Sequence, residues 1–138
     1  MRVMKFGVVS VSDAVRLREM AQIVRDAHDD GEPLIVVCAA IGGITDKLIN
    51  AARSAANGAD AVVEDVRREL WSRHRTLAER LVSDQWERET LYREWAELLK
   101  VFDRYTRSIA TLGEHSPRSI DTVAALGERF ATHLVATA

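Results

Sequence analysis

The feature that most constrains this chain is an unbroken heptad pattern in its second half. Apolar residues recur there at alternating spacings of four and three, at Leu91, Trp95, Leu98, Phe102, Tyr105, Ile109 and Leu112. Such a stripe predicts a long amphipathic helix whose apolar face packs against other helices. Asp84 and Glu87 have the spacing of a capping box that would start this helix. The fold must therefore supply a helical surface for the stripe to cover.

The preceding segment offers that surface. Between Ala59 and Val82, apolar residues follow helical spacing at Val63, Val66, Leu70, Leu77 and Leu81, and His74 interrupts them. Together the two segments predict an antiparallel helical hairpin over residues 59–113. Its seam is covered either by the chain's own core or by a second copy. No basic stripe accompanies Trp71, Trp86 and Trp95, so we assign them to packing rather than to base stacking.

The first third of the chain has an α/β pattern. Arg2 to Val9 is a short, valine-rich run that predicts a strand. Ser12 is the expected N-cap of a helix whose apolar stripe is Leu17, Met20, Val24 and Ala27. Leu34 to Ala40 is continuously apolar, which indicates a second, parallel strand buried on both faces. These elements predict a βαβ unit.

Two further helices complete the predicted fold. Gly42 and Gly43 follow the second strand, and a helix is expected from about Thr45 to Asn57. Its start could hold an anion, or it could be a tight turn without a ligand. Ser116 is the expected N-cap of a last helix that runs to the chain end. We therefore predict a single α/β domain, mostly helical, with a βαβα unit (1–58), a hairpin (59–113) and a C-terminal helix (114–138).

Composition narrows the classes of function. The net charge of -2 favours neither nucleic acid nor an anionic membrane as partner, and no apolar run approaches the roughly 18 residues of a membrane span. Cys38 is the single cysteine, and the four histidines lie far apart. These counts argue against a disulfide and a metal centre, and they fit a cytoplasmic protein.

Three separated segments resemble a known family. KFGVVSV is similar to the family's K-F-G-G-T-S-V. VVCAAIGGITDKLI is similar to V-V-S-A-M-x-G-V-T-D-x-L-I, and LGEHSPRSIDTVAALGERFAT to L-G-E-x-[ST]-P-R-x-x-D-x-V-x-S-F-G-E-R-L-S. Their order, with a helical hairpin between the second and third, resembles the N-terminal half of an aspartokinase catalytic domain in the amino-acid kinase family. The resemblance covers essentially the whole chain.

The resemblance implies an activity and a set of residue roles. Enzymes of this kind transfer the γ-phosphoryl group of ATP, bound with Mg, to the side-chain carboxylate of L-aspartate. Lys5 matches the lysine that neutralises phosphate charge, and Gly7 and Ser10 match residues of the phosphate loop. Thr45 matches a hydroxyl that contacts aspartate, and Glu128 matches the acidic residue that holds its amino group.

The chain also departs from the family pattern. Val8 replaces the second glycine of the phosphate loop, and Val9 replaces its threonine. A β-branched side chain restricts a backbone that must approach phosphate. Ala39 stands where the family has a serine that helps to bind aspartate, and Ala125 and Ala131 replace serines that flank the GER sequence. These changes predict a degraded site.

The resemblance also limits the activity expected of this chain alone. In the family the sheet continues beyond the GER sequence, and the second half supplies most of the ATP site. We therefore expect aspartate kinase chemistry only with a complementary C-terminal half, and no ATP turnover by the isolated chain. The alternatives are a non-catalytic aspartate-binding module and a helical oligomerisation module that forms a homo-oligomer.

Overall fold

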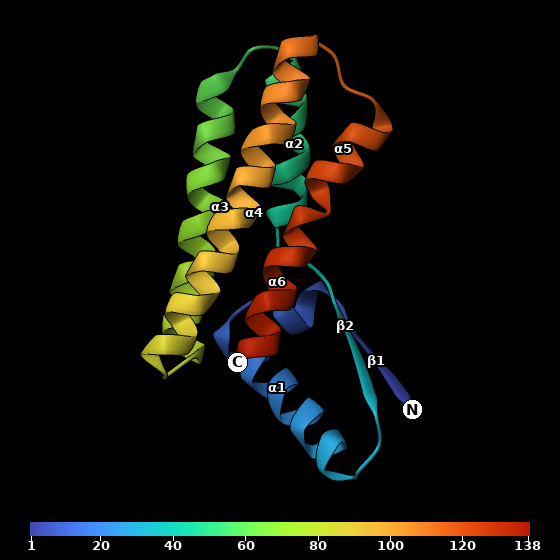
Figure 1. Cartoon of the computed structure of the whole chain (residues 1–138). Coiled ribbons are helices and arrows are strands. Elements are labelled where there is room, and N and C mark those ends of the chain that lie inside the picture. The colour runs from blue at the N-terminus through green and yellow to red at the C-terminus, as the bar shows by residue number, and fades with distance from the viewer.

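The computed structural model describes residues 1–138 and is mostly helical, with one short sheet. In chain order the elements are β1 (Arg2–Phe6), the 3-10 turn η1 (Val8–Val11), α1 (Ala14–Asp29), β2 (Leu34–Cys38), α2 (Ile44–Ala56), α3 (Asp60–Leu81), α4 (Gln85–Leu112), α5 (Pro117–Ala124) and α6 (Leu126–Thr137). Figure 1 shows the helices α2–α6 as an elongated bundle with β1, β2 and α1 gathered at one end. The prediction of a mostly helical chain with a short parallel sheet is confirmed. None of the helices combines the length and apolarity needed to cross a membrane.

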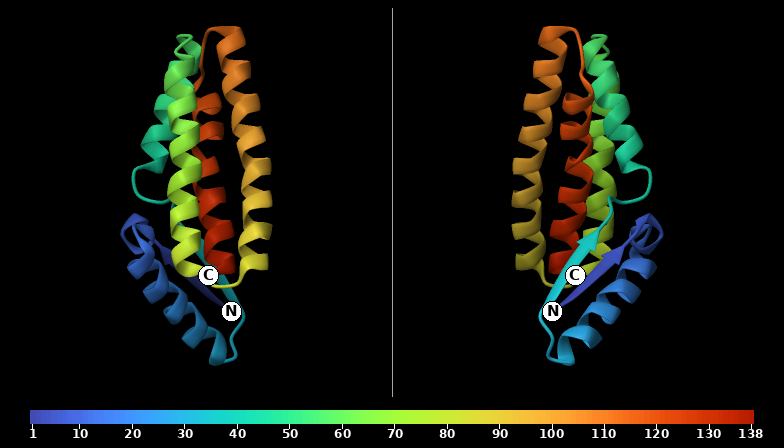
Figure 2. Two further views of the ribbon diagram at one scale, coloured as in Figure 1. Left: turned by 90° about the vertical axis from the view of Figure 1, so that its left-hand side faces the viewer. Right: turned by 90° about the vertical axis from the view of Figure 1, so that its right-hand side faces the viewer.

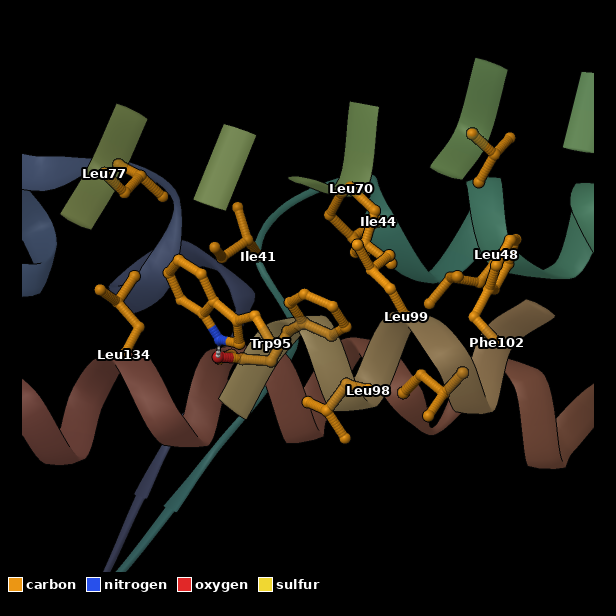
Figure 3. Close-up of a cluster of buried hydrophobic side chains, with 14 of the residues drawn as sticks. Ile41, Ile44, Leu48, Leu70, Leu77, Trp95, Leu98, Leu99, Phe102 and Leu134 are labelled. Atoms are coloured by element: carbon orange, nitrogen blue, oxygen red, sulfur yellow. Dashed lines mark hydrogen bonds between the residues drawn. The ribbon is translucent and has the colours of Figure 1, made fainter. Parts of the chain in front are cut away.

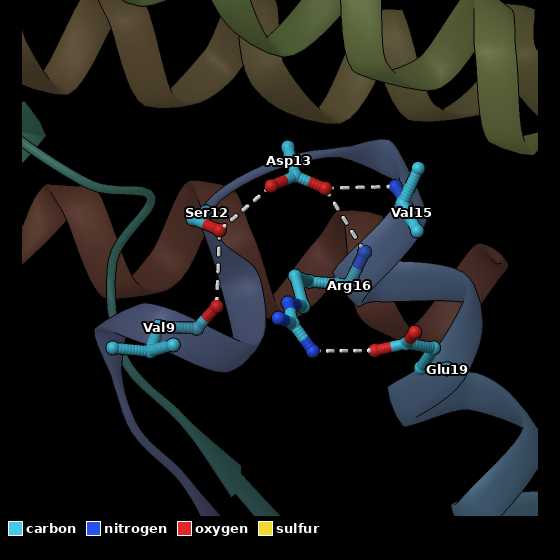
Figure 4. A network of polar contacts seen from close by, with 6 residues as sticks. All are labelled: Val9, Ser12, Asp13, Val15, Arg16 and Glu19. Atoms are coloured by element: carbon cyan, nitrogen blue, oxygen red, sulfur yellow. Dashed lines mark hydrogen bonds and ion pairs between the residues drawn. The ribbon is translucent and has the colours of Figure 1, made fainter.

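The N-cap of α1 lies one residue later than predicted. Asp13, and not Ser12, accepts hydrogen bonds from the backbone N–H groups of Val15 (2.9 Å) and Arg16 (3.0 Å). The Ser12 hydroxyl instead lies within hydrogen-bond distance of the Asp13 carboxylate (2.9 Å) and the Val9 carbonyl (3.0 Å), which share its one hydrogen, as Figure 4 shows. The bond from the Arg16 N–H, aided by that from Ser12, lowers the pKa of Asp13. A carboxylate is the stronger acceptor for these N–H donors, which explains why the cap moves.

β1 and β2 form a two-stranded parallel sheet in which Lys5 pairs with Val37 and Phe6 with Cys38. Only one of its faces is covered, so the expectation that Leu34 to Ala40 is buried on both faces is wrong. On the covered face, Phe6, Val36 and Cys38 pack against the core. On the other face, Ile35 and Val37 are each 46% exposed. Continuous apolarity in a parallel strand indicates two covered faces only when elements exist to cover both.

The bundle buries the predicted seam inside the chain. Leu91, Trp95, Leu98, Phe102 and Ile109 are buried and Tyr105 is half-buried, but Leu112 is 72% exposed in the last turn of α4. Figure 3 shows what covers the buried part of the seam. α2 (teal) enters between α3 and α4, with Ile44 and Leu48 facing the seam. The seam therefore packs on the chain's own core, which was one of the two predicted outcomes.

Two details at the start of α4 differ from the prediction. Trp86 is 68% exposed, because it lies in the first turn beyond the packed part of the hairpin, where the Arg93 guanidinium covers its ring at 5.6 Å. Packing into the core is therefore wrong for this tryptophan. Asp84 caps the helix by accepting from the Glu87 N–H at 2.8 Å. Glu87 returns no bond, so half of the predicted capping box forms.

The C-terminal helix is divided in two. Ser116 caps α5 as predicted, and Ser119 completes a capping box with it. Ala125 then separates α5 from α6, whereas a single helix was expected. The break precedes Gly127, where α6 makes a very close contact with the segment after β2. The run LGERFATHLVATA begins directly after this break and is helical, as α6.

Candidate functional site

The three motif segments meet where the parallel strands end. β1 leads into η1 and β2 leads into the turn before α2, and a side chain at Gly42 would be 3.7 Å from Cγ2 of Val8. α6 approaches the same turn from the other side, since a Cβ added at Gly127 would lie 2.9 Å from the Cβ of Ala40 and 3.2 Å from Cγ2 of Ile44. The carboxyl ends of strands in open α/β sheets are where ligands bind. The fold therefore brings the motif segments together at the carboxyl edge of the sheet.

The loop after β1 is a single 3-10 turn. The Ser10 N–H bonds to the carbonyl of Gly7 at 3.0 Å, and this closes the turn on itself. Val8 is 50% exposed and Val9 is 70% exposed, so both β-branched side chains face outward at the position of the family's phosphate loop. A loop that satisfies its own backbone and displays two valines is poorly suited to surround a phosphate.

The turn after β2 depends on two glycines. Gly43 has φ of +80°, in the left-handed region, and is the N-cap of α2. The Ile44 N–H bonds to the carbonyl of Ile41 (3.0 Å), and the Lys47 N–H bonds to that of Gly43 (3.3 Å). This is the tight strand-to-helix turn that was one of the two predicted possibilities. Thr45 lies in the first turn of α2 and is half-buried.

α6 carries Glu128 and is held firmly against the hairpin. The Trp95 Nε1–H donates to the carbonyl of Phe130 at 3.1 Å, and the two rings stack with centroids 5.9 Å apart. On the sheet side, Thr132 Oγ1 lies 3.7 Å from Sγ of Cys38. These contacts fix the first turn of α6, in which Glu128 is half-buried next to the tightly packed Gly127.

The structure places the remaining candidate residues as follows. Lys5 is exposed on the open face of the sheet, and Ala39 extends β2 by donating its N–H to the carbonyl of Phe6 at 3.0 Å. The side chains of Lys5, Thr45 and Glu128 take part in no hydrogen bond or ion pair within the chain, and the bond that Glu128 accepts from the Thr132 hydroxyl goes to its backbone carbonyl. All three polar groups are therefore free to meet a ligand. Their roles remain predictions.

No group of three or more histidine, cysteine, aspartate or glutamate side chains is placed to hold a metal ion. A cavity of about 200 Å³ lies beside the loop and includes Ser10, but its walls come from β1, η1 and α1 and include neither Thr45 nor Glu128. The cavity beside the loop is therefore separate from the candidate residues Thr45 and Glu128.

The contacts of two residues near the site were not predicted from the sequence, although His74 was noted there as an interruption of the apolar spacing. Arg73 of α3 donates from Nη2 to the carbonyl of Gly42 at 2.8 Å. His74 beside it is fully buried against Trp95 and Phe130, with ring centroids 5.5 Å and 4.9 Å away. Burial lowers the pKa of His74 to about 4. Neither contact has a local sequence signal, because the partners lie 21 or more residues away.

Comparison with known proteins agrees with this arrangement. The model of the amino acid kinase family matches residues 1–138. The chain belongs to the amino acid kinase family. This confirms the resemblance inferred from the three motifs.

Solved structures of one relative share the fold of this amino acid kinase chain. They are aspartokinase III of E. coli in complex with aspartate and ADP (R-state), with 23% identity and a TM-score of 0.74, and the same enzyme in complex with lysine and aspartate (T-state), with 24% identity and a TM-score of 0.71. Each match covers 98% of this chain and 28% of the other chain. The likeness is therefore one of fold, over about a quarter of the relative's length.

Proposed function

We propose that this chain is the N-terminal part of an aspartokinase-type catalytic domain. In this role it supplies an L-aspartate half-site from Thr45 and Glu128, and Lys5 as the cation that faces the transferred phosphoryl group. The observation that carries the proposal is the convergence of the three motif segments, with Val8 against Gly42 and Gly127 against Ala40. Membership of the amino acid kinase family and the aspartate-bound relative support it.

Each proposed role follows from the chemistry of the side chain. A carboxylate such as Glu128 suits the ammonium group of an amino acid, and the Thr45 hydroxyl can donate to its carboxylate. The exposed ammonium of Lys5 suits the negative charge of a phosphoryl group. Bound L-aspartate would present its side-chain carboxylate, whose oxygen attacks the γ-phosphorus of ATP while the bond to ADP breaks.

The isolated chain should bind without turnover. It offers no cluster of three or more metal-ligating side chains, and its phosphate loop carries Val8 and Val9. The open face of the sheet, with Ile35 and Val37 each 46% exposed, is where a complementary C-terminal half would dock. ATP and Mg contacts would come from that half. In the homo-oligomer alternative, the helical seam is no longer free, because its residues are packed inside the chain.

Thermal denaturation of the purified chain tests the half-site. We expect millimolar L-aspartate to raise the melting temperature, whereas MgATP and L-glutamate should not. A ligand that binds only the folded state adds about 2.7 kcal/mol at a hundredfold excess over its Kd. Thr45→Val and Glu128→Gln should abolish the shift, and Thr111→Val, at the far end of α4, should keep it.

Two results would contradict parts of this proposal. The absence of any aspartate shift in the unmodified chain would remove the half-site and leave a vestigial pocket. An acyl phosphate trapped by hydroxylamine, from the chain with MgATP and aspartate, would show turnover by the chain alone. An aspartate shift without acyl phosphate is the expected result, and it is equally the behaviour of a non-catalytic aspartate-binding module. Recovery of turnover on adding a complementary half would then favour the split catalytic domain.

A further inference from the structure

We propose that Arg73 is a positioning residue for this site: from the hairpin, its guanidinium fixes the Gly42–Gly43 turn and thereby sets the place of Thr45. The inference rests on the proposed function for its meaning, although its structural part can be tested without any ligand. The central observation is the 2.8 Å bond from Arg73 Nη2 to the carbonyl of Gly42, which joins residues 31 positions apart in the chain.

The turn needs an external constraint because its own residues are permissive. Two consecutive glycines, with Gly43 at φ of +80°, give this peptide more accessible backbone conformations than any other pair of residues would. The carbonyl of Gly42 points to α3, where the only donor that meets it is Arg73. Nη1 of Arg73 also lies 3.7 Å from the place where a Cβ on Gly43 would sit. The guanidinium thus lies directly against the pivot of the turn.

Glu69, one turn earlier on α3, lies beside Arg73 and also pairs with α2. Glu69 Oε1 lies 3.9 Å from Nη1 of Arg73, and Oε2 lies 2.8 Å from Nζ of Lys47 on α2. α3 therefore contacts the chain on both sides of Thr45, at the Gly42 carbonyl in the turn before α2 and at the Lys47 ammonium within α2. Movement of Thr45 relative to α3 would break one of these attachments.

Hydrogen exchange of backbone amides, measured by NMR on the whole chain, tests the positioning directly. The reporters are the amides of Ile44 and Lys47, which bond within the turn. In Arg73→Ala we expect exchange at these amides to accelerate about tenfold, the effect of losing one charge-assisted hydrogen bond. Amides in the middle of α4 should be unchanged. Arg75→Ala is the matched control, because Arg75 pairs with Glu79 and faces solvent.

Chemical rescue separates positioning from a general structural effect. Millimolar guanidinium can enter the half-exposed space left by Arg73→Ala and should restore slow exchange at Ile44 and Lys47. The same concentration of urea should not. If the unmodified chain binds L-aspartate, the Kd should rise about tenfold in Arg73→Ala and recover with guanidinium.

The outcomes are separable. Unchanged exchange at Ile44 and Lys47 in Arg73→Ala would overturn the inference, and so would an equal acceleration throughout α4, which indicates global destabilisation. Failure of the unmodified chain to bind L-aspartate would remove the proposed half-site, and exchange would still decide whether Arg73 orders the turn. Normal aspartate affinity in Arg73→Ala would overturn the link between the turn and Thr45.

Discussion

The two ends of this molecule differ in how completely they bury their apolar side chains. In the bundle, Trp95, Phe102 and Phe130 have no exposed surface, whereas on the open face of the sheet Ile35 and Val37 are each 46% exposed. Figure 2 shows the two strands and α1 at one end of the helical bundle. The helices of the bundle bury their apolar faces against one another. The two-stranded sheet has only one covered face, and its other face keeps apolar side chains exposed. The motif residues lie at the boundary between the end that is complete and the end that needs cover.

This difference indicates that the bundle determines the stability of the fold and that the open sheet face determines binding to a partner. Removing a buried group from a close-packed interior lowers the free energy of unfolding. An open sheet face loses little until something docks on it. Substitutions at matched positions in the two ends should therefore differ in size, and the predictions below run from the largest expected effect to the smallest.

The largest effect is expected for Trp95→Ala. The indole packs against Trp71, His74, Tyr92 and Phe130, and it donates to the Phe130 carbonyl. Its removal should lower the free energy of unfolding by about 3–5 kcal/mol. Chemical denaturation followed by circular dichroism measures this loss. Trp86→Ala is the control, and it should change stability by less than about 0.5 kcal/mol because the side chain is 68% exposed. Equal losses would contradict the difference in burial.

Much of the bundle could be predicted from the sequence, because helical periodicity reports which face is covered. The heptad stripe correctly predicted that the seam from Leu91 to Ile109 is covered. It failed at Leu112, where α4 extends beyond the helices that it packs on. The same reasoning failed for the sheet. The sequence of an apolar strand such as β2 has the same pattern whether its second face is covered or open, since the pattern describes the strand and not its neighbours.

The second prediction concerns pH and the buried imidazole of His74. Its Nδ1–H donates to the Leu70 carbonyl at 2.6 Å, and Nε2 has no partner. Burial lowers its pKa from 6.5 to about 4, so between these values the unfolded chain binds more protons than the folded one. The stabilisation that comes from keeping His74 neutral is therefore complete above about pH 6.5, and it is lost as the pH falls to about 4. The loss amounts to about 3 kcal/mol.

Denaturation curves across this pH range provide the measurement. His74→Phe keeps a ring among Trp95 and Phe130 and removes the titrating group, so its stability should vary less between pH 6.5 and 4 than that of the unmodified chain. His28→Phe is a matched control on α1, where the side chain is exposed. If His74→Phe leaves the pH dependence unchanged, other groups cause it.

The third prediction concerns the contact between α6 and the turn. Gly127→Ala should lower stability by about 1–3 kcal/mol, because its methyl group would meet the Cβ of Ala40 at 2.9 Å. In a helix without this contact, alanine would be the better residue by about 1 kcal/mol. Gly7→Ala is the control, since nothing lies within 4 Å of the added Cβ. A stabilised Gly127→Ala variant, measured by denaturant titration, would mean that α6 is free to move away.

The residues of the candidate site could be predicted from the sequence, but the long-range contacts that arrange them could not. The motif residues Lys5, Thr45 and Glu128 could be named because local sequence carries them. The contacts that arrange them could not, because Arg73 meets Gly42 across 31 residues and Gly127 meets Ala40 across 87. Such pairs depend on how α3 and α6 dock, and no residue near the motifs specifies that docking.

The smallest effect, and the sharpest test of the comparison, comes from a pair of neighbouring valines on β2. Val36 packs against the core and Val37 faces away from it at 46% exposure. Val36→Ala should cost about 1 kcal/mol, and Val37→Ala less than about 0.5 kcal/mol. Equal costs would show that the second face is already covered in solution, for example by another copy of the chain. If a complementary half docks there, Val37→Ala should weaken that association while leaving the stability of the isolated chain unchanged. The open face would then be an interface whose contribution appears only in the assembled domain.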